Sequence, residues 1–328
     1  MKIPEDAIQF SDQFATEDGC LDFIEEVRWP HGFVCPNCQH NDGYHLHTRK
    51  LIQCVLCRHQ SSVTAGTIFH KTKVPLRAWF YIIFSMAHDK GGASSTRLAR
   101  ELGMNQNTVW HIMHKLRRAM GARDQSITLA GFIEMDEAVL GPHARRPKQD
   151  KKARSEDEDR DLPKKPPRGG RGRKSKAGTK RKKQVDVLVL VEQERSHAGY
   201  IAMKVLEATA ANDLNEVLNA RVDEGSHIKT DGFHAHHTAL RSFNCTYKAV
   251  VCSGPDGCIE LPIVHRVINL LKHFLMGTYF GVSRTHLQLY LNEFCFRFIR
   301  RESDRPLWLS VLRAGIFSPP WQNAELTT

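Results

Sequence analysis

Apolar residues recur at helical spacing in the first 120 residues of the chain. A patch from Trp79 to Met86, preceded by Pro75, predicts one buried helix that is too short to span a bilayer. Further on, a short helical segment stops at Gly103 and a second segment follows. The apolar residues of this second segment repeat at helical spacing and should face a core: Val109, Ile112, Met113 and Leu116. Helix, glycine turn and helix is typical of a helix-turn-helix, which we predict for residues 72–122.

The second half of the chain alternates strand patterns with helical patterns. Turn-bounded, β-branched runs predict strands at residues 131–141, 185–192, 198–205 and 226–232. Helices are expected at residues 211–222, from about residue 262, and at 283–300. Strands interleaved with helices imply an α/β domain, placed at residues 128–302. Residues 1–30 are expected to be a helical segment, and residues 303–328, with Trp308 and Trp321 among prolines, a loosely structured tail.

One segment carries nearly all of the positive charge. The chain has 47 Lys and Arg against 36 Asp and Glu, and residues 145–183 hold 18 of the basic and 6 of the acidic ones. The rest of the chain is therefore close to neutral. Because this run is punctuated by proline and glycine and lacks apolar residues to bury, we predict a disordered basic insertion at residues 144–183. Its expected partner is nucleic acid, bound through phosphates; the alternative is a merely solvated linker.

Four cysteines have the spacing of zinc ligands. Cys35 and Cys38 form one C-x2-C pair, Cys54 and Cys57 form another, and 15 residues separate the pairs. This pattern predicts a zinc ribbon at residues 31–64, with structural Zn2+ held by four thiolates, rather than four buried free thiols. With no apolar signal region and no run long enough to cross a bilayer, we expect a cytoplasmic protein with no membrane partner, in which the nine cysteines are thiols or metal ligands rather than disulfides.

The start of the second helix of the pair carries side chains suited to DNA. Those expected near the major groove are Gln106, Asn107, Thr108 and His111. Those expected at phosphates are Lys115, Arg117 and Arg118. A plain pair of helices without DNA contact remains the alternative.

Two acidic residues lie on predicted strands of the α/β domain. Asp136 lies on the first strand, and Asp231 ends the strand at 226–232. Two carboxylates brought together in one sheet can bind a divalent cation, although acids at strand ends are also frequent caps and turn formers. The histidine-rich run at residues 234–237 is not assigned to a metal; we expect a loop or helix start beside Asp231.

The order of these motifs resembles a known family. A zinc ribbon, a helix-turn-helix, the strand around Asp136, the strand ending at Asp231, and a closing block from Leu271 to Arg301 are similar to the zinc-ribbon-bearing DDE transposases of bacterial insertion sequences, the ISXO-like family. The resemblance covers residues 15–301. It implies an RNase H-like fold in which three acidic positions bind two Mg2+ ions for DNA strand cleavage and strand transfer. Asp136 matches the first acid and Asp231 the second.

The third acidic position departs from the family pattern. Counting back from Lys272 places it at His265, on the helix that begins near residue 262. His265, Asn269 and Lys272 are spaced to share one helix face, and Lys272 has a plausible role at a phosphate. Since imidazole suits Mg2+ less well than carboxylate does, we expect Mn2+ to be the better catalytic ion. Alternatively, Glu137 or Glu260 supplies the missing oxygen, or His265 is a packing residue or cap.

The combined interpretation is a transposase of a bacterial insertion sequence. It would bind terminal inverted repeats through residues 30–120 and cut DNA through Asp136, Asp231 and the helix of His265. Its partners would be double-stranded DNA, as element ends and as target, and at least one further copy of the chain on that DNA. Two alternatives remain: a catalytically impaired, transposase-derived DNA-binding regulator, and a nuclease or recombinase without strand transfer.

Overall fold

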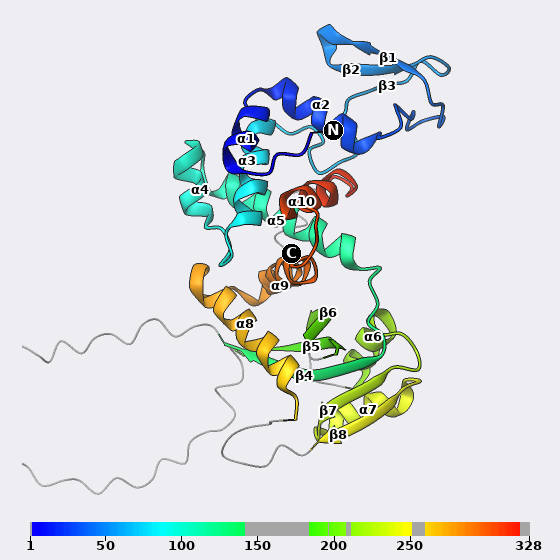
Figure 1. The fold of residues 1–328 in the computed structure, drawn as a ribbon, viewed down its shortest axis with the longest axis vertical. Coiled ribbons are helices and arrows are strands. Elements are labelled where there is room, and N and C mark those ends of the chain that lie inside the picture. Colours follow the sequence, from blue (N-terminus) through cyan, green and yellow to red (C-terminus); the bar gives the residue numbers. More distant parts are fainter. Residues whose placement is uncertain (1, 142–183, 196, 208–210, 251–259, 322–328) are drawn as a thin grey trace, which may run out of the picture.

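The computed structural model describes residues 2–141, 184–195, 197–207, 211–250 and 260–321. The predicted basic insertion at residues 144–183 lies outside the described residues. Figure 1 shows a helical part with a small sheet at one end and a larger sheet with its own helices at the other. No helix of the described residues is long and apolar enough to cross a membrane.

The N-terminal part consists of five helices and a three-stranded sheet. Its elements are α1 Ala7–Gln13, α2 Glu17–Arg28, β1 Gly43–Leu46, the 3-10 turn η1 His47–Arg49, β2 Leu51–Cys54, β3 Gln60–Ser61, α3 Leu76–His88, α4 Ser95–Leu102 and α5 Gln106–Asp124. The side chains of Ser94 and Asn105 cap the first turns of α4 and α5 by accepting backbone N–H bonds. Gly103 ends α4 with a left-handed φ of 60°. Two helices joined by a tight turn therefore lie where the helix-turn-helix was predicted, and their contact with DNA stays a prediction.

The C-terminal part contains a five-stranded mixed sheet. Its elements are β4 Phe132–Leu140, β5 Val185–Glu194, β6 His197–Val205, α6 Ala211–Arg221, β7 His227–Asp231, α7 His234–Ser242, β8 Thr246–Val250, α8 Pro262–Thr278 and α9 Arg284–Ile299. The strand order is β6-β5-β4-β7-β8, with β4 antiparallel to β5 and parallel to β7. The predicted α/β organisation is confirmed. Strand β8 was not predicted from the sequence; it is short and has only one fully buried residue, Val250.

Each face of this sheet is covered by different helices. Ala138 on β4 and Val187, Val189 and Val191 on β5 pack with α8 and α9. The alternate positions of the same strands, among them Met135 on β4, pack with α6 and α7. Successive strand residues point to opposite faces, so residues 134, 136 and 138 of β4 point toward α8.

The predicted loose tail contains a helix that is part of the N-terminal core. Residues Leu307–Ile316 form α10, and Trp308 is 2 % exposed among the rings of Phe10, Phe14 and Phe23. The expectation of a loosely structured tail is therefore wrong for these residues. The prolines on either side bound a ten-residue helix whose apolar residues need a core to bury them.

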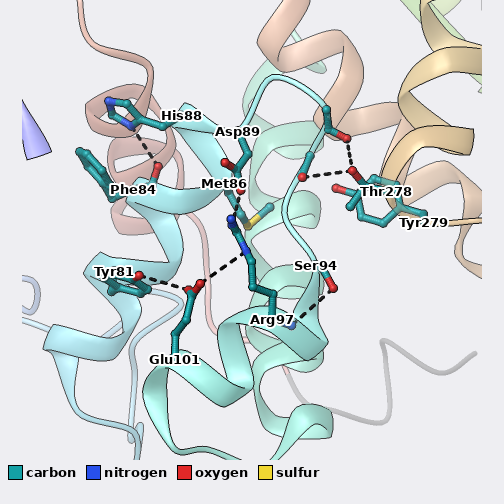
Figure 2. A network of polar contacts seen from close by, with 12 residues as sticks. Tyr81, Phe84, Met86, His88, Asp89, Ser94, Arg97, Glu101, Thr278 and Tyr279 are labelled. Atoms are coloured by element: carbon teal, nitrogen blue, oxygen red, sulfur yellow. Dashed lines mark hydrogen bonds and ion pairs between the residues drawn. The ribbon is translucent and has the colours of Figure 1, made fainter.

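Polar contacts join the two parts of the chain. The loop between α3 and α4 is held on one side by Arg97, which pairs with Asp89. On its other side Thr278 of α8 donates to the carbonyl of Gly91 at 2.7 Å, as Figure 2 shows. At Gly92, with a φ of 91°, an added Cβ would lie 2.2 Å from the hydroxyl of Tyr279, so no larger residue fits there.

Helices α5 and α9 form the centre of this junction. Arg117 of α5 and Glu293 of α9 are 1 % and 0 % exposed, and Arg117 Nε donates to Glu293 Oε2 at 2.7 Å. Asp124 of α5 also accepts two hydrogen bonds from Arg300, the residue that follows α9. The assignment of Arg117 to a DNA phosphate is therefore wrong, because its guanidinium is enclosed between the two parts of the protein and already paired.

Candidate functional site

The four cysteines of the ribbon converge on one point. Their sulfur atoms all lie within 4.8 Å of one another, with 3.6 Å between Cys35 and Cys57 and 3.6 Å between Cys38 and Cys54. Four thiolates at about 2.3 Å from a central Zn2+ are separated by about 3.8 Å in a tetrahedron. The sulfur positions therefore fit a structural zinc ion.

The two cysteine pairs have the same backbone geometry. The N–H of Cys35 donates to the carbonyl of His40, and the N–H of Cys54 donates to that of His59. The turns pass through Gln39 and Arg58, both left-handed with φ near 60°. The backbone N–H of His59 also lowers the pKa of the Cys57 thiol to about 6, which favours the thiolate that zinc requires. Two equivalent turns explain how such distant cysteines reach one centre.

Asp136 and Asp231 are neighbours on adjacent parallel strands. Met135 of β4 is in register with Thr230 of β7, the last pair of these strands, so Asp136 in the middle of β4 and Asp231 at the end of β7 each follow directly after it. Thr230 Oγ1 and Asp231 Oδ1 both lie within hydrogen-bond distance of His236 Nδ1 of α7, at 2.6 and 2.8 Å. The Asp231 charge contributes to raising the pKa of Asp136, as expected for nearby carboxylates. The two predicted acids therefore lie on neighbouring strands, and their joint binding of a cation stays a prediction.

His265 lies directly over Asp136. It occupies the first turn of α8, and its Nε2 is 3.0 Å from Asp136 Oδ2. The pKa of Asp136 is raised, first because burial disfavours the charged carboxylate, while the N–H of Glu137 and the charge of His265 lower it. His265 is 37 % exposed and Asp136 is 17 % exposed, so the pair borders solvent from which a cation or DNA can approach.

Glu134 fixes α8 on the sheet, a function that the sequence analysis did not assign to it. This buried carboxylate accepts hydrogen bonds from the backbone N–H groups of Ile263 and Val264, at 2.9 and 2.8 Å. A carboxylate is stabilising at a helix N-terminus, where N–H groups lack partners within the helix. Since Glu134 and Asp136 point to the same face of β4, one strand both anchors α8 and contacts its His265. The signal in the sequence was an acid two positions before Asp136.

His236 joins the second acid to Glu137. Its side chain is fully buried at the start of α7, with Nδ1 2.8 Å from Asp231 Oδ1 and Nε2 2.9 Å from Glu137 Oε1. Burial lowers the pKa of His236, but the bonds and charges of Glu137 and Asp231 outweigh it, and the net pKa is raised. The histidine-rich run is thus a helix start beside the second acid, as expected, and His236 positions Asp231.

The remaining residues considered for the third metal position lie further away or are already paired. Glu137 bonds His236 of α7, and Glu260 pairs with Lys229 at 3.4 Å. Asn269 and Lys272 are exposed on α8, and within the described part of the chain neither bonds Asp136 or Asp231. Helix α8 itself contains no Asp or Glu. Among the described residues, the four cysteines form the only group of three or more ligand atoms within 4.8 Å of one another.

The residues predicted to bind DNA differ in how exposed their side chains are. Gln106 and Asn107 are exposed in the first turn of α5, and Thr108, His111 and Lys115 are partly exposed. Arg118 lies under the ring of Trp321, 4.6 Å from its centroid, and Arg117 is buried as described above. The residues predicted to enter the groove are therefore accessible. Of the three cations predicted to contact phosphates, Arg117 is not accessible.

Comparisons with known proteins place these features in a family. Residues 128–298 match the ISXO2-like transposase domain, and residues 15–60 match the transposase zinc-ribbon domain. A relative from Halobacterium salinarum, described as an uncharacterized protein in transposable element ISH50, is 24 % identical over 87 % of this chain and 91 % of its own length.

Solved structures of the Mos1 transposase are also similar in part. A pre-cleavage Mos1 transpososome gives a TM-score of 0.29 over 71 % of this chain and 78 % of that one. The Mos1 strand transfer complex gives 0.30 over 72 % and 74 %, and both are 14 % identical to this chain. Scores this low add nothing to the family match, which covers just over half of the chain. The chain belongs to the ISXO2-like transposase family.

Proposed function

We propose that this protein is an active transposase whose Asp136 and Asp231 hold a divalent cation for DNA strand cleavage and strand transfer. The observation that supports the proposal is the parallel pairing of β4 and β7, in which Asp136 and Asp231 directly follow the paired residues Met135 and Thr230, together with the 3.0 Å contact of Asp136 with His265. The strand order, with its three parallel strands, supports an RNase H-like classification for residues 128–302. The family match to a transposase domain over the same residues supports the reaction class.

The donor set suits a hard divalent ion. Carboxylate oxygens of Asp136 and Asp231 are the ligands that Mg2+ and Mn2+ prefer, and His265 adds a nitrogen that Mn2+ accepts more readily. When bound, such ions activate the attacking hydroxyl and stabilise the leaving oxygen. The protein's own contribution is to hold the carboxylates in place: His236 orients Asp231, and Glu134 keeps the His265 turn of α8 against Asp136. Asn269 and Lys272 are proposed to meet the DNA further along α8.

The DNA is proposed to contact the N-terminal part at the same time. Gln106, Asn107, Thr108 and His111 would enter the major groove of the element ends, and Lys115 and Arg118 would contact phosphates. The basic run in the sequence at residues 145–183 adds sequence-independent attraction to DNA. Because transposition joins two ends to one target, the working assembly is proposed to hold at least two copies of the chain.

The test uses the purified full-length chain and duplexes carrying the sequences that flank its gene. Asp136→Asn keeps the shape of the side chain but removes its charge. We expect it to bind the ends as the wild type does, to lose cleavage in both Mg2+ and Mn2+, and to lose the rise in melting temperature that these ions give the wild type. Asp12→Asn, an exposed residue in α1, serves as the matched control and should change none of these. Binding without cleavage by the wild type itself would indicate a regulator instead.

A further inference from the structure

We infer that the loop joining the ribbon to α3 forms, together with α5, a second binding site for the DNA backbone. Its residues His70, Lys71 and Lys73 line one hollow of about 220 Å3 with Thr108, His111 and Lys115 of α5. The inference rests on the proposed DNA binding by α5. It adds a contact from the loop before α3, which lies outside the helix pair α4 and α5.

The hollow is lined by groups of one charge sign. Three lysines and two histidines contribute to it, and none of its lining residues is acidic. Lys71 and Lys73 are exposed, and Lys115 is partly exposed. A concave surface with only basic and neutral groups concentrates its positive potential on whatever enters it.

These lysines are also unpaired. Within the described ranges, the side chains of Lys71, Lys73 and Lys115 make no hydrogen bond or ion pair, whereas Arg117 and Arg300 at the junction are both paired with carboxylates. Burial lowers the pKa of Lys115, since its ammonium gives up water without gaining a protein anion. A partly desolvated cation without a partner is stabilised when an external anion supplies the missing charge.

The loop is held in one conformation. Its Thr72 accepts hydrogen bonds from the indole of Trp79 at 3.0 Å and from the N–H of Val74 at 3.1 Å. Trp79 is itself 2 % exposed, so these bonds tie the loop to the core of the N-terminal part. Lys71 and Lys73 flank Thr72 in the sequence, and both are exposed. Two cations on a fixed loop lose little entropy when they bind, which suits phosphate recognition.

The position of the hollow favours a DNA strand over a small anion. It adjoins the first half of α5, where Gln106 and Asn107 are exposed for base contacts. A duplex that receives this end of α5 in its major groove presents the flanking phosphates to the neighbouring surface. Lys71 and Lys73 then hold the backbone beside the bases that α5 contacts.

The salt dependence of DNA binding measures these contacts directly. Each phosphate contact contributes about 0.9 to the slope of log K against log salt concentration. The double variant Lys71→Gln with Lys73→Gln should therefore lower the magnitude of the slope by about 1.8, and adding Lys115→Gln should lower it by about 0.9 more. The probes are an element-end duplex and a duplex of arbitrary sequence, titrated into the full-length zinc-loaded chain. The control variant, Lys2→Gln with Lys248→Gln, removes the same charge at exposed positions elsewhere.

The outcomes separate this inference from the proposed function. A reduced slope in the loop variant, with the control variant unchanged and both melting like the wild type, supports the loop contact. An unchanged slope in a wild type that binds DNA normally overturns the loop contact and leaves α5 as the DNA-binding element. A slope reduced equally by the control variant also overturns it, because the effect is then one of net charge. A wild type that binds neither duplex overturns the proposed function itself.

Discussion

Removing the charge of Arg117 should destabilise the protein more than almost any other change at a single polar residue. Its guanidinium is 1 % exposed, bonds Glu293 at 2.7 Å, and stacks over the ring of Tyr290 at 3.9 Å from its centroid. Arg117→Met preserves most of the volume of the side chain and its contact with the ring. It leaves Glu293 as a buried carboxylate whose nearest remaining cation is Arg297, at 3.7 Å.

The expected cost follows from the burial of both partners. Breaking a fully buried ion pair by removing one partner typically costs about 3–5 kcal/mol, which is a large share of the roughly 5–15 kcal/mol by which proteins are stable. Replacing both partners with apolar residues is often neutral or stabilising, because no charge is then left without water. Arg117→Met with Glu293→Leu should therefore recover most of the loss, giving a favourable coupling energy of about 3 kcal/mol.

Urea unfolding of the wild type, the two single variants and the double variant supplies the free energies for this cycle. Arg77→Met, at an exposed arginine of α3, is the matched control and should stay within about 0.5 kcal/mol of the wild type. The reasoning is refuted if Arg117→Met costs less than about 1 kcal/mol, or if the double variant is as unstable as the sum of the single ones. Arg117 joins α5, which carries the residues proposed to face DNA, to α9, which packs on the sheet. Arg117→Met should therefore reduce DNA cleavage more than it reduces DNA binding.

Three further predictions concern the two metal centres. Removing zinc with a chelator should unfold the ribbon and weaken DNA binding while the five-stranded sheet stays folded, as seen by proteolysis confined to residues 31–64. His265→Glu should raise cleavage in Mg2+ relative to Mn2+; a wild type that cuts equally well with both ions would contradict the reasoning. Glu134→Gln should cost about 1–2 kcal/mol in unfolding free energy, because its charge at the N-terminus of α8 is lost. Its cleavage should fall while its DNA binding is unchanged, and equal losses of both would point to general unfolding.

Local patterns in the sequence were enough to place most of the site. The C-x2-C spacing located the ribbon ligands, because the geometry of each pair depends on only a few neighbouring residues. The strand patterns located Asp136 and Asp231 on β4 and β7, because β-branched runs bounded by turns mark each strand locally. These features share one property: the residues that decide them lie within a few positions of each other or follow from strand periodicity.

Contacts between distant segments could not be predicted in this way. Arg117 has the same place in the helical pattern as a DNA-facing cation, and only Glu293, 176 residues later, shows that it is buried. Trp308 is surrounded by prolines that suggest a loop, and its burial depends on rings near residue 10. In each case the partner that decides the residue's environment is a side chain that no local pattern identifies.

The departure at the third metal position follows from how β4 divides its acidic residues. Glu134 is committed to the N-terminus of α8, Glu137 to His236 on the opposite face, and only Asp136 remains beside α8. Because α8 contains no carboxylate, the ligand that its first turn offers an ion beside Asp136 is the imidazole of His265. His265 already bonds Asp136, so a cation that binds these two side chains must displace the hydrogen bond between them. An ion that binds nitrogen well loses less in this exchange, so the preference for Mn2+ that we expect would follow from the composition of the helix as well as from the single histidine.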